Sequence, residues 1–114
     1  MRRTRLYIAG PMRGIPELNH PAFFEAEAAL RPRYITFNPA RQDQDSGIDE
    51  AAFADNENAI IREVLELDTR WICRHADGIA LLNGWRYSKG AKMEVALGKA
   101  LGLPVRPYRD WITL

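Results

Sequence analysis

The sequence is poor in the residues that form disulfides and structural metal centres. Its 114 residues include one cysteine, Cys73, and two histidines. One cysteine cannot form an internal disulfide, and with two histidines it cannot complete a Cys/His zinc site. We therefore predict no metal. A single cysteine is also typical of chains that stay in a reducing compartment, so we expect a cytoplasmic protein.

The sequence also lacks long apolar runs and an excess of charge of one sign. Sixteen basic and fifteen acidic residues leave a formal charge of +1, which gives no general attraction for polyanions or for membranes. The longest apolar runs, such as residues 79–82, fall far short of the ~20 residues of a membrane helix. An apolar signal-peptide region is not seen after residues 1–3. We expect neither a nucleic acid polymer nor a membrane as partner.

What remains is an ordinary globular composition in a short chain. Apolar residues make up 46% and charged residues 27% of the sequence, which argues against disorder and low-complexity structure. The length leaves no room for linkers or repeats. We therefore predict one domain, residues 1–114, with one core.

The order of predicted elements indicates an α/β fold. Short apolar runs predict strands at 6–9, 34–37, 79–82 and 105–108, and helical periodicity predicts helices at about 19–30, 50–75 and 89–101, with a polar loop at 38–49. This alternation is typical of a parallel sheet, here of about four strands, with helices on both faces. Ligands bind such sheets beyond the carboxyl ends of the strands, so the loops after the first three strands are the candidate site.

Glu94 is the first unusual acid. Its helical neighbours three and four positions away are Ala91, Gly90, Leu97 and Gly98, so it has no ion-pair partner on its own helix. The two glycines lower helix stability and indicate that a ligand or another backbone approaches this face closely. A glutamate on an exposed, glycine-containing face is the alternative.

Asp68 is the second unusual acid, because it lies within the apolar stripe of the predicted long helix. Burying an unpaired carboxylate costs several kcal/mol, so this group should be partnered, protonated with a raised pKa, or open to a cleft. A raised pKa suits a proton donor. A purely structural acid, bonded to Trp71, a tyrosine or a loop amide, fits the pattern equally well.

Three further residues are candidates for such a site. Tyr7 can bring its hydroxyl near the end of the first strand, although most such tyrosines belong to the core. Arg13, between Gly10 and Gly14, can clamp a phosphate. Ser88 starts a predicted helix, where free backbone amides bind anions, or it simply caps the helix.

Together these residues lie in motifs that resemble a known family. The motifs are LYIAGPMRG at 6–14, Asp68 with Trp71 and the Ala-Asp pair at 76–77, and SKGAKMEVAL at 88–97. They are similar to those of the nucleoside 2'-deoxyribosyltransferase superfamily, most closely to its short, often phage-encoded members. The resemblance covers residues 5–108.

The resemblance implies a flavodoxin-like (Rossmann-like) three-layer sandwich and a glycosyl-transfer reaction. It implies that Glu94 attacks the anomeric carbon of a 2-deoxyribosyl group to give a covalent glycosyl-enzyme, that Tyr7 orients this carboxylate, and that Asp68 protonates or holds the departing base. This chemistry needs no metal or cofactor. The resemblance also favours a homo-oligomer, with a dimer preferred.

Position 88 bears on the substrate. Free-nucleoside transferases of this superfamily commonly carry Asp there, whereas the deoxynucleoside 5'-monophosphate N-glycosidase branch carries Ser, with Arg at the position of Arg13. The glycosidase branch has Gly-Ser where this chain has Gly10-Pro11. We predict an enzyme that cleaves or transfers at the N-glycosidic bond of a 2'-deoxyribonucleoside, with the 5'-monophosphate favoured. The predicted substrate-binding residues are Gly10, Met12, Arg13, Gly14, Ser88 and Gly90.

Two other functions are compatible with these residues. The same pocket could bind a nucleotide or sugar phosphate without catalysis. Trp85 and Tyr87, which flank Arg86 after the third predicted strand, could stack on a base or pack on a neighbouring subunit. If they are buried in an interface and no small molecule binds, the protein would act only as an interaction partner.

Overall fold

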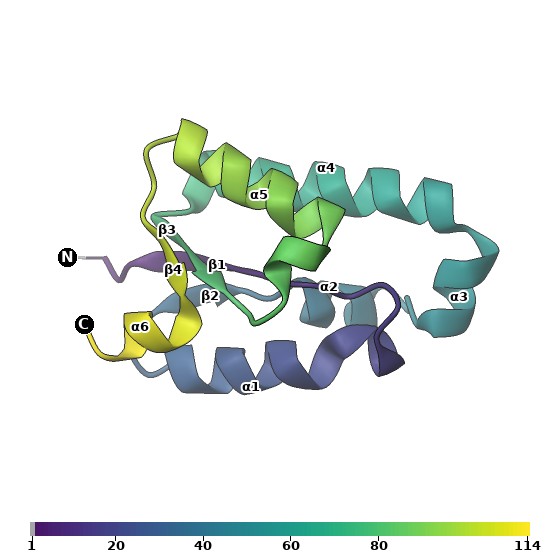
Figure 1. The fold of residues 1–114 in the computed structure, drawn as a ribbon, viewed down its shortest axis with the longest axis horizontal. Coiled ribbons are helices and arrows are strands. Elements are labelled where there is room, and N and C mark those ends of the chain that lie inside the picture. The colour runs from purple at the N-terminus through teal and green to yellow at the C-terminus, as the bar shows by residue number, and fades with distance from the viewer. Residues whose placement is uncertain (1) are drawn as a thin grey trace.

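The four strands form one parallel sheet in the computed structural model, which describes residues 2–114 (Figure 1). The strand order is β2-β1-β3-β4, as in the first four strands of the flavodoxin-like order. The predicted α/β class and the parallel four-stranded sheet are therefore confirmed. The strands are β1 (Arg5–Ala9), β2 (Ile35–Phe37), β3 (Gly78–Leu81) and β4 (Val105–Pro107).

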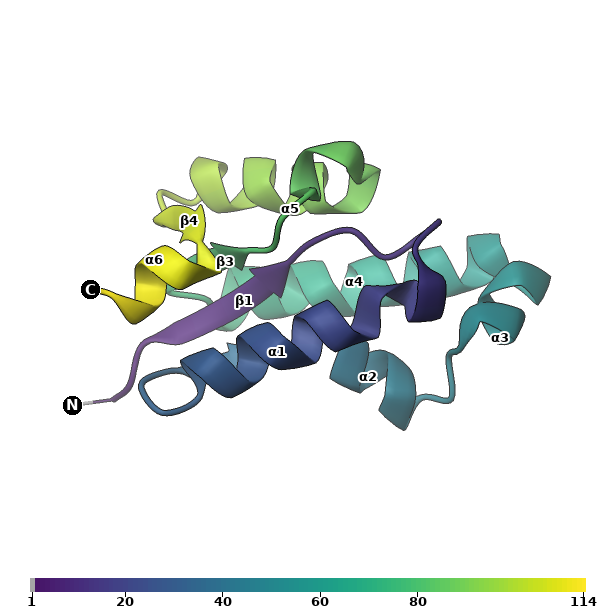
Figure 2. The ribbon, with the colours of Figure 1, turned by 60° about the horizontal axis from the view of Figure 1, so that its bottom comes forward.

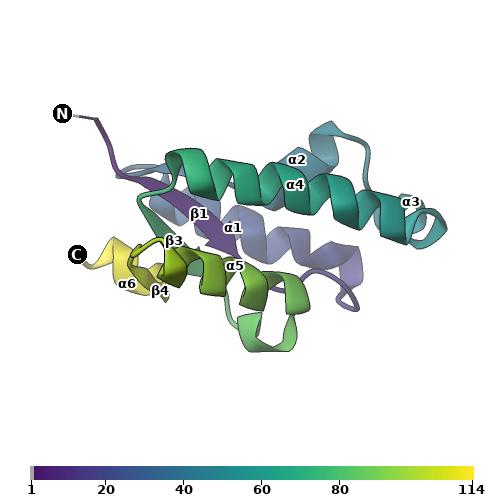
Figure 3. The same cartoon turned by 90° about the horizontal axis from the view of Figure 1, so that it is seen from above.

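Helices cover both faces of this sheet, which gives three layers (Figures 2 and 3). One face packs against α1 (His20–Leu30), α2 (Pro39–Asp45) and α6 (Tyr108–Ile112), and the other against α4 (Glu57–His75) and α5 (Lys89–Ala100). The central strand β1 is apolar on both sides, as expected for a strand buried between two helix layers. Leu6 and Ile8 face the α1 layer, whereas Tyr7 and Ala9 face α4 and α5.

The polar stretch after β2 is not a loop throughout, which corrects the sequence prediction. Residues 39–45 form α2, because the Asn38 side chain accepts a hydrogen bond from the Ala40 amide and Pro39 occupies the first helical turn. Short 3-10 helices precede α1 and follow β3, at Pro16–Asn19 (η1) and Trp85–Tyr87 (η2).

The predicted long helix at 50–75 is two helices. A short α3 (Glu50–Asp55), capped by the Asp49 side chain, ends at Asn56, whose φ of −137° is not helical, and α4 begins at the next residue. The chain also continues past β4 into α6, which the sequence did not predict. Trp111 of α6 is buried and donates from its indole nitrogen to the Ile79 carbonyl at 3.0 Å.

This topology creates a crevice beside β1. The chain leaves β1 toward β2 on one side of the sheet and leaves β3 toward β4 on the other. The loops after β1 and β3 therefore diverge, which opens space at their carboxyl ends. Within residues 2–114, no helix combines the length and the apolar character needed to cross a membrane.

Candidate active site

Most of the predicted site residues surround one cavity of about 230 Å³ at the carboxyl end of β1. Tyr7 comes from β1, Asp68 from α4 and Glu94 from α5. Five of the six predicted binding residues line it with them, namely Gly10, Met12, Arg13, Ser88 and Gly90. Gly14 does not line this cavity; it adopts a φ of +80° one residue further along the loop and faces a neighbouring depression.

Tyr7 and Glu94 make direct contact at the base of the cavity. The Tyr7 hydroxyl donates to Glu94 Oε2 at 2.5 Å, and both residues are buried. Tyr7 reaches this point because alternation along β1 directs it toward the α4 and α5 layer. Glu94 shares the inward face of α5 with Ala91, Val95 and Gly98. The exposed-surface interpretation of Glu94 is therefore wrong.

The two glycines flanking Glu94 serve different purposes. A Cβ at Gly98 would overlap the Ile79 side chain, so this glycine lets α5 pack closely on β3. A Cβ at Gly90 would meet only Ser88 Oγ, at 3.9 Å. Gly90 therefore leaves open space at the cavity wall, and Gly98 is explained by backbone packing.

Glu94 and Asp68 are two buried acids in one cavity. Burial raises the pKa of Glu94 to about 8, and the negative charge of Asp68 raises it further against the lowering effect of the Tyr7 hydrogen bond. Burial also raises the pKa of Asp68 to about 7, opposed by Tyr7 and increased by Asp43. Among the described residues, no basic side chain forms an ion pair with either acid. The pair therefore retains protons at pH values where ordinary carboxyls are ionised.

Tyr7 is held as a hydrogen-bond donor. Its ring stacks on Phe37 with 5.4 Å between centroids and lies 6.4 Å from the Trp71 ring. Burial, followed by the charge of Glu94, raises the pKa of the Tyr7 hydroxyl well above its ordinary value. The phenol thus keeps its proton, and its packed ring fixes the direction of the bond to Glu94.

The α5 end of the cavity offers groups suited to an anion. Ser88 Oγ accepts from the Ala91 amide at 3.1 Å, so Ser88 does cap the helix, and Ser88, Lys89 and Gly90 at this helix start line the cavity. Arg13 reaches the same mouth but is already paired, because its Nη1 lies 2.8 Å from Glu57 Oε1. Both side chains of this pair are about half exposed.

Part of the cavity lining is apolar, and the sequence did not predict it as part of the site. Ile61, Val64 and Leu65 of α4 and Phe53 of α3 form this part. The three α4 residues lie seven, four and three positions before Asp68, so the same helical stripe that singled out the acid also marked its surroundings. Phe53 gave no such signal, because the break at Asn56 redirects α3.

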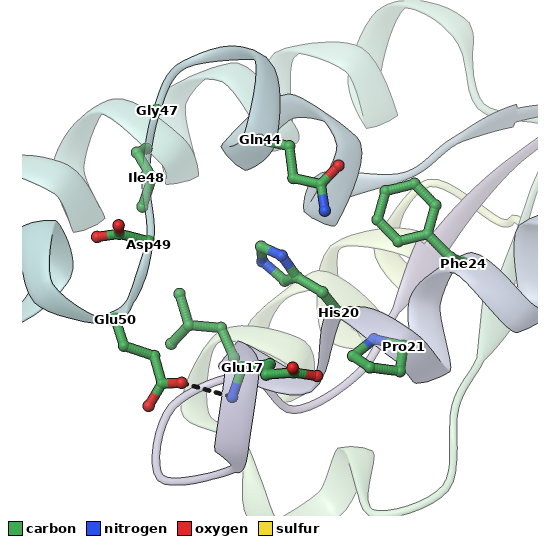
Figure 4. Close-up of a pocket in the computed structure, with 10 residues that line it drawn as sticks. Glu17, His20, Pro21, Phe24, Gln44, Gly47, Ile48, Asp49 and Glu50 are labelled. Carbon is green, nitrogen blue, oxygen red and sulfur yellow. Dashed lines mark hydrogen bonds between the residues drawn. The ribbon is translucent and has the colours of Figure 1, made fainter.

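A second and larger cavity, of about 540 Å³, lies between α1 and the segment that joins α2 to α3 (Figure 4). Its polar groups stabilise the fold: the Glu17 amide donates to Glu50 at 2.7 Å, Asp49 caps α3, and His20 lies 3.5 Å from Asp43. None of the predicted site residues lines it. Within the described chain, no cluster of three or more His, Cys, Asp or Glu side chains could hold a metal ion.

Comparison with known proteins identifies the family but gives no activity. A protein family described as "Domain of unknown function (DUF4406)" matches residues 4–106. Neither a curated protein nor a solved structure matches the chain. The match spans nearly the whole sequence, and the chain therefore belongs to the DUF4406 family.

Proposed function

We propose that this protein cleaves or transfers at the N-glycosidic bond of a 2'-deoxyribonucleoside 5'-monophosphate, through a covalent intermediate on Glu94. The observation that carries the proposal is the buried pair of Glu94 and Asp68, which shares one cavity with the Tyr7 hydroxyl and has no basic partner. Paired acids of this kind are the working groups of retaining glycosidases. The resemblance of the motifs at 6–14 and 88–97 to nucleoside 2'-deoxyribosyltransferases supports the same chemistry.

The residues that line the cavity are of three kinds, one for each part of a nucleotide. Ser88, Gly90 and Arg13 suit a phosphate, Asp68 and Glu94 suit the sugar at which the bond breaks, and apolar side chains of α3 and α4 suit the faces of a base. The sugar's anomeric carbon would then lie between the two carboxyls, where the reaction requires it.

In the first step the Glu94 carboxylate attacks the anomeric carbon and forms an ester. The bond between that carbon and the base nitrogen breaks, its electron pair leaves with the base, and Asp68 donates its proton to the base. Asp68 is then an anion. The Tyr7 hydroxyl orients Glu94 by donating to its second carboxylate oxygen during the attack.

In the second step an acceptor releases the sugar. Water, or a second base in the transfer reaction, attacks the anomeric carbon and breaks the ester, which returns the electron pair to Glu94. Asp68 removes the acceptor's proton and regains its acid form. Water gives 2-deoxyribose 5-phosphate as product, and every proton and charge is restored at the end of the cycle.

Catalysis needs one proton on the pair. With both pKa values raised, to about 7 and about 8, the singly protonated pair is most populated near neutral pH. Tyr7 stabilises the form in which Glu94 carries the charge, because its hydroxyl donates to that carboxylate. Because the pKa of Glu94 exceeds that of Asp68, the single proton resides mostly on Glu94 in the free protein, and the reaction uses the minor form in which Asp68 holds it. We therefore expect a bell-shaped dependence of kcat/KM on pH.

Incubation with each of the four deoxynucleoside 5'-monophosphates and their nucleosides tests the proposal, with free base measured by chromatography. We expect base release by the native protein and a loss of at least about 10³-fold in Glu94→Gln, which cannot form the ester. Glu63→Gln, an exposed change on α4, serves as the matched control and should be fully active. Equal release by the native protein and Glu94→Gln contradicts the assignment.

The same samples distinguish catalysis from binding alone. Thermal stabilisation by a monophosphate, without base release and unchanged in Glu94→Gln, would identify a nucleotide-binding module instead. Sedimentation of the native protein tests the homodimer that the resemblance favours. The outcome of that measurement does not bear on the roles of Glu94 and Asp68.

A further inference from the structure

The predicted phosphate-binding arginine is held by an acid at the mouth of the cavity. Arg13 Nη1 donates to Glu57 Oε1 at 2.8 Å, and the two side chains are 46% and 51% exposed. Arg13 follows β1 in the chain, whereas Glu57 is the first residue of α4. The pair therefore bridges two segments that are far apart in sequence.

A second contact joins the segment after β1 to the neighbouring helix α3. The Glu17 amide of η1 donates to Glu50 Oε1 of α3 at 2.7 Å (Figure 4). Asn19 anchors the loop after β1 by donating from Nδ2 to the Pro11 carbonyl at 2.9 Å. These contacts fix the loop independently of Glu57. Breaking the Arg13–Glu57 pair should therefore free the arginine side chain while its backbone stays in place.

From this arrangement we infer that Glu57 is a specificity-determining residue, whose carboxylate occupies Arg13 at the position that a substrate 5'-phosphate takes over. The inference rests on the proposed function, because it assumes that a monophosphate enters the cavity beside Ser88 and Gly90. It assigns to Glu57 the strength with which a nucleotide is preferred over its nucleoside.

Electrostatics determine the direction of this effect. A carboxylate and a phosphate both bind the planar guanidinium fork, so they compete for its N–H groups. An exposed ion pair is weak, and a dianionic phosphate supported by the α5 amides can displace it. The displaced carboxylate stays near the bound phosphate and repels it, an effect that salt screens. A nucleoside has no phosphate and is insensitive to both contributions.

Binding measurements with an inactive protein test this assignment. In the Glu94→Ala background, we would measure the Kd of the four deoxynucleoside 5'-monophosphates and of the four nucleosides by calorimetry, with and without Glu57→Gln. We expect Glu57→Gln to tighten monophosphate binding by about three-fold at 50 mM salt, in line with the small energy of an exposed pair. The gain should shrink at 500 mM salt, and nucleoside binding should not change.

Glu63→Gln is the matched control, because it removes the same charge from an exposed site on α4. An equal gain in Glu63→Gln would show a general charge effect and overturn the inference. Weaker monophosphate binding in Glu57→Gln would also overturn it, since Glu57 would then orient Arg13 for the substrate. The absence of any measurable monophosphate binding would overturn the inference as well.

The inference and the proposed function fail separately. If the predicted binding differences appear but the native protein releases no base, the function is wrong and the role of Glu57 stands. If base is released but Glu57→Gln leaves the KM for the monophosphate unchanged, the proposed function stands and the role assigned to Glu57 is wrong. Arg13→Ala should remove the difference between the Glu57 variants in both assays.

Discussion

The two faces of the sheet each bury a glutamate to the same degree, yet the two side chains behave in opposite ways. Glu27 on α1 and Glu94 on α5 are both 6% exposed. Hydrogen bonds from Arg41, opposed by burial, lower the pKa of Glu27, whereas burial beside Asp68 raises the pKa of Glu94 to about 8. The Arg41 partner outweighs the effect of burial on Glu27, whereas Glu94 has no basic partner and burial dominates its pKa.

Of these two buried glutamates, Glu27 serves the fold, whereas Glu94 is available for chemistry. Arg41 donates through Nε and Nη2 to the two oxygens of Glu27, which ties α2 to α1. This bidentate pair is fully engaged and lines neither cavity. Glu94 lacks such a partner and opens to the cavity. Uncompensated buried acids reduce stability, and proteins keep such groups mainly at functional sites.

Among the variants that sharpen this comparison, removal of Asp68, the second acid of the cavity, should have the largest effect, second only to that of Glu94→Gln. Asp68→Asn cannot donate a proton to the base, so we expect kcat to fall by about 10²–10³-fold. Glu27→Gln, the buried acid of the other face, should lower stability but leave kcat/KM within about two-fold. Base release measured for both variants checks this. A comparable loss in both would mean that either acid supports activity only through the fold.

Each face of the sheet also contains a tyrosine that donates a short hydrogen bond, one in the cavity and one beside the core. Tyr7 donates to Glu94 and Tyr34 donates to the Trp111 carbonyl on the other face, each at 2.5 Å. Removing a donor to a charged group costs about 1.5–3 kcal/mol, so Tyr7→Phe should reduce kcat by at least about 10-fold. It should also shift the acidic limb of the pH–rate profile to higher pH, since Glu94 becomes harder to ionise.

Tyr34→Phe is the matched control for that measurement. It removes a hydroxyl of the same kind from a structural site, so stability should fall while the pH–rate profile keeps its position. A shifted profile in Tyr34→Phe, or an unshifted one in Tyr7→Phe, would show that the Tyr7 hydroxyl does not act through Glu94.

Stability should depend on pH with opposite signs at the two kinds of site. Glu94 and Asp68 have folded-state pKa values near 8 and 7, above their ordinary values of 4.5 and 3.8. Between these limits the native state holds more protons than the unfolded state, so the free energy of unfolding falls as pH rises. We expect the double variant Glu94→Gln/Asp68→Asn to lose this decline between pH 6 and 8, a difference of about 4 kcal/mol in urea unfolding.

Asp77 supplies the internal control for the sign. Hydrogen bonds from Arg2 lower its pKa to about 2, so its contribution disappears as pH falls from about 4 to about 2. That acid limb should persist in the double variant. Asp43, whose pKa burial raises to about 6, should leave a decline below pH 6 in both proteins. Identical curves from pH 6 to 8 would contradict the raised values in the cavity.

The sequence predicted those features of the fold and the site that depend on residues close together in the chain. Local patterns located β1, β3 and α5, because apolar runs and the Ser88 cap act within a few residues. They also singled out Asp68 and Glu94 as acids in apolar surroundings. The bond from Tyr7 to Glu94 crosses 87 positions, and only the resemblance linked the two residues.

Other features had no reliable local signal. The break at Asn56 hid α3 and therefore the Phe53 wall of the cavity. Arg13 looked like a free cation, because Glu57 lies 44 residues away in the sequence. The cap of α2, by contrast, was visible as Asn38 followed by Pro39 and could have been recognised.

The smallest predicted effect tests whether a cation alone separates the two glutamates. Arg41→Met should remove both hydrogen bonds to Glu27 and leave the carboxyl buried among α1 and α2 side chains. We expect the free energy of unfolding to fall by about 1 kcal/mol at neutral pH, a modest loss because the Arg41 side chain is half exposed and water can replace part of it. The pKa of Glu27 should change from lowered to raised, which NMR titration of its carboxyl carbon can follow, while kcat/KM stays unchanged. Arg41→Lys keeps the charge and should retain a lowered pKa. If Glu27 remains an ordinary ionised carboxylate in Arg41→Met, its surroundings are more hydrated than those of Glu94. The lack of a basic partner would then no longer explain why Glu94 holds its proton.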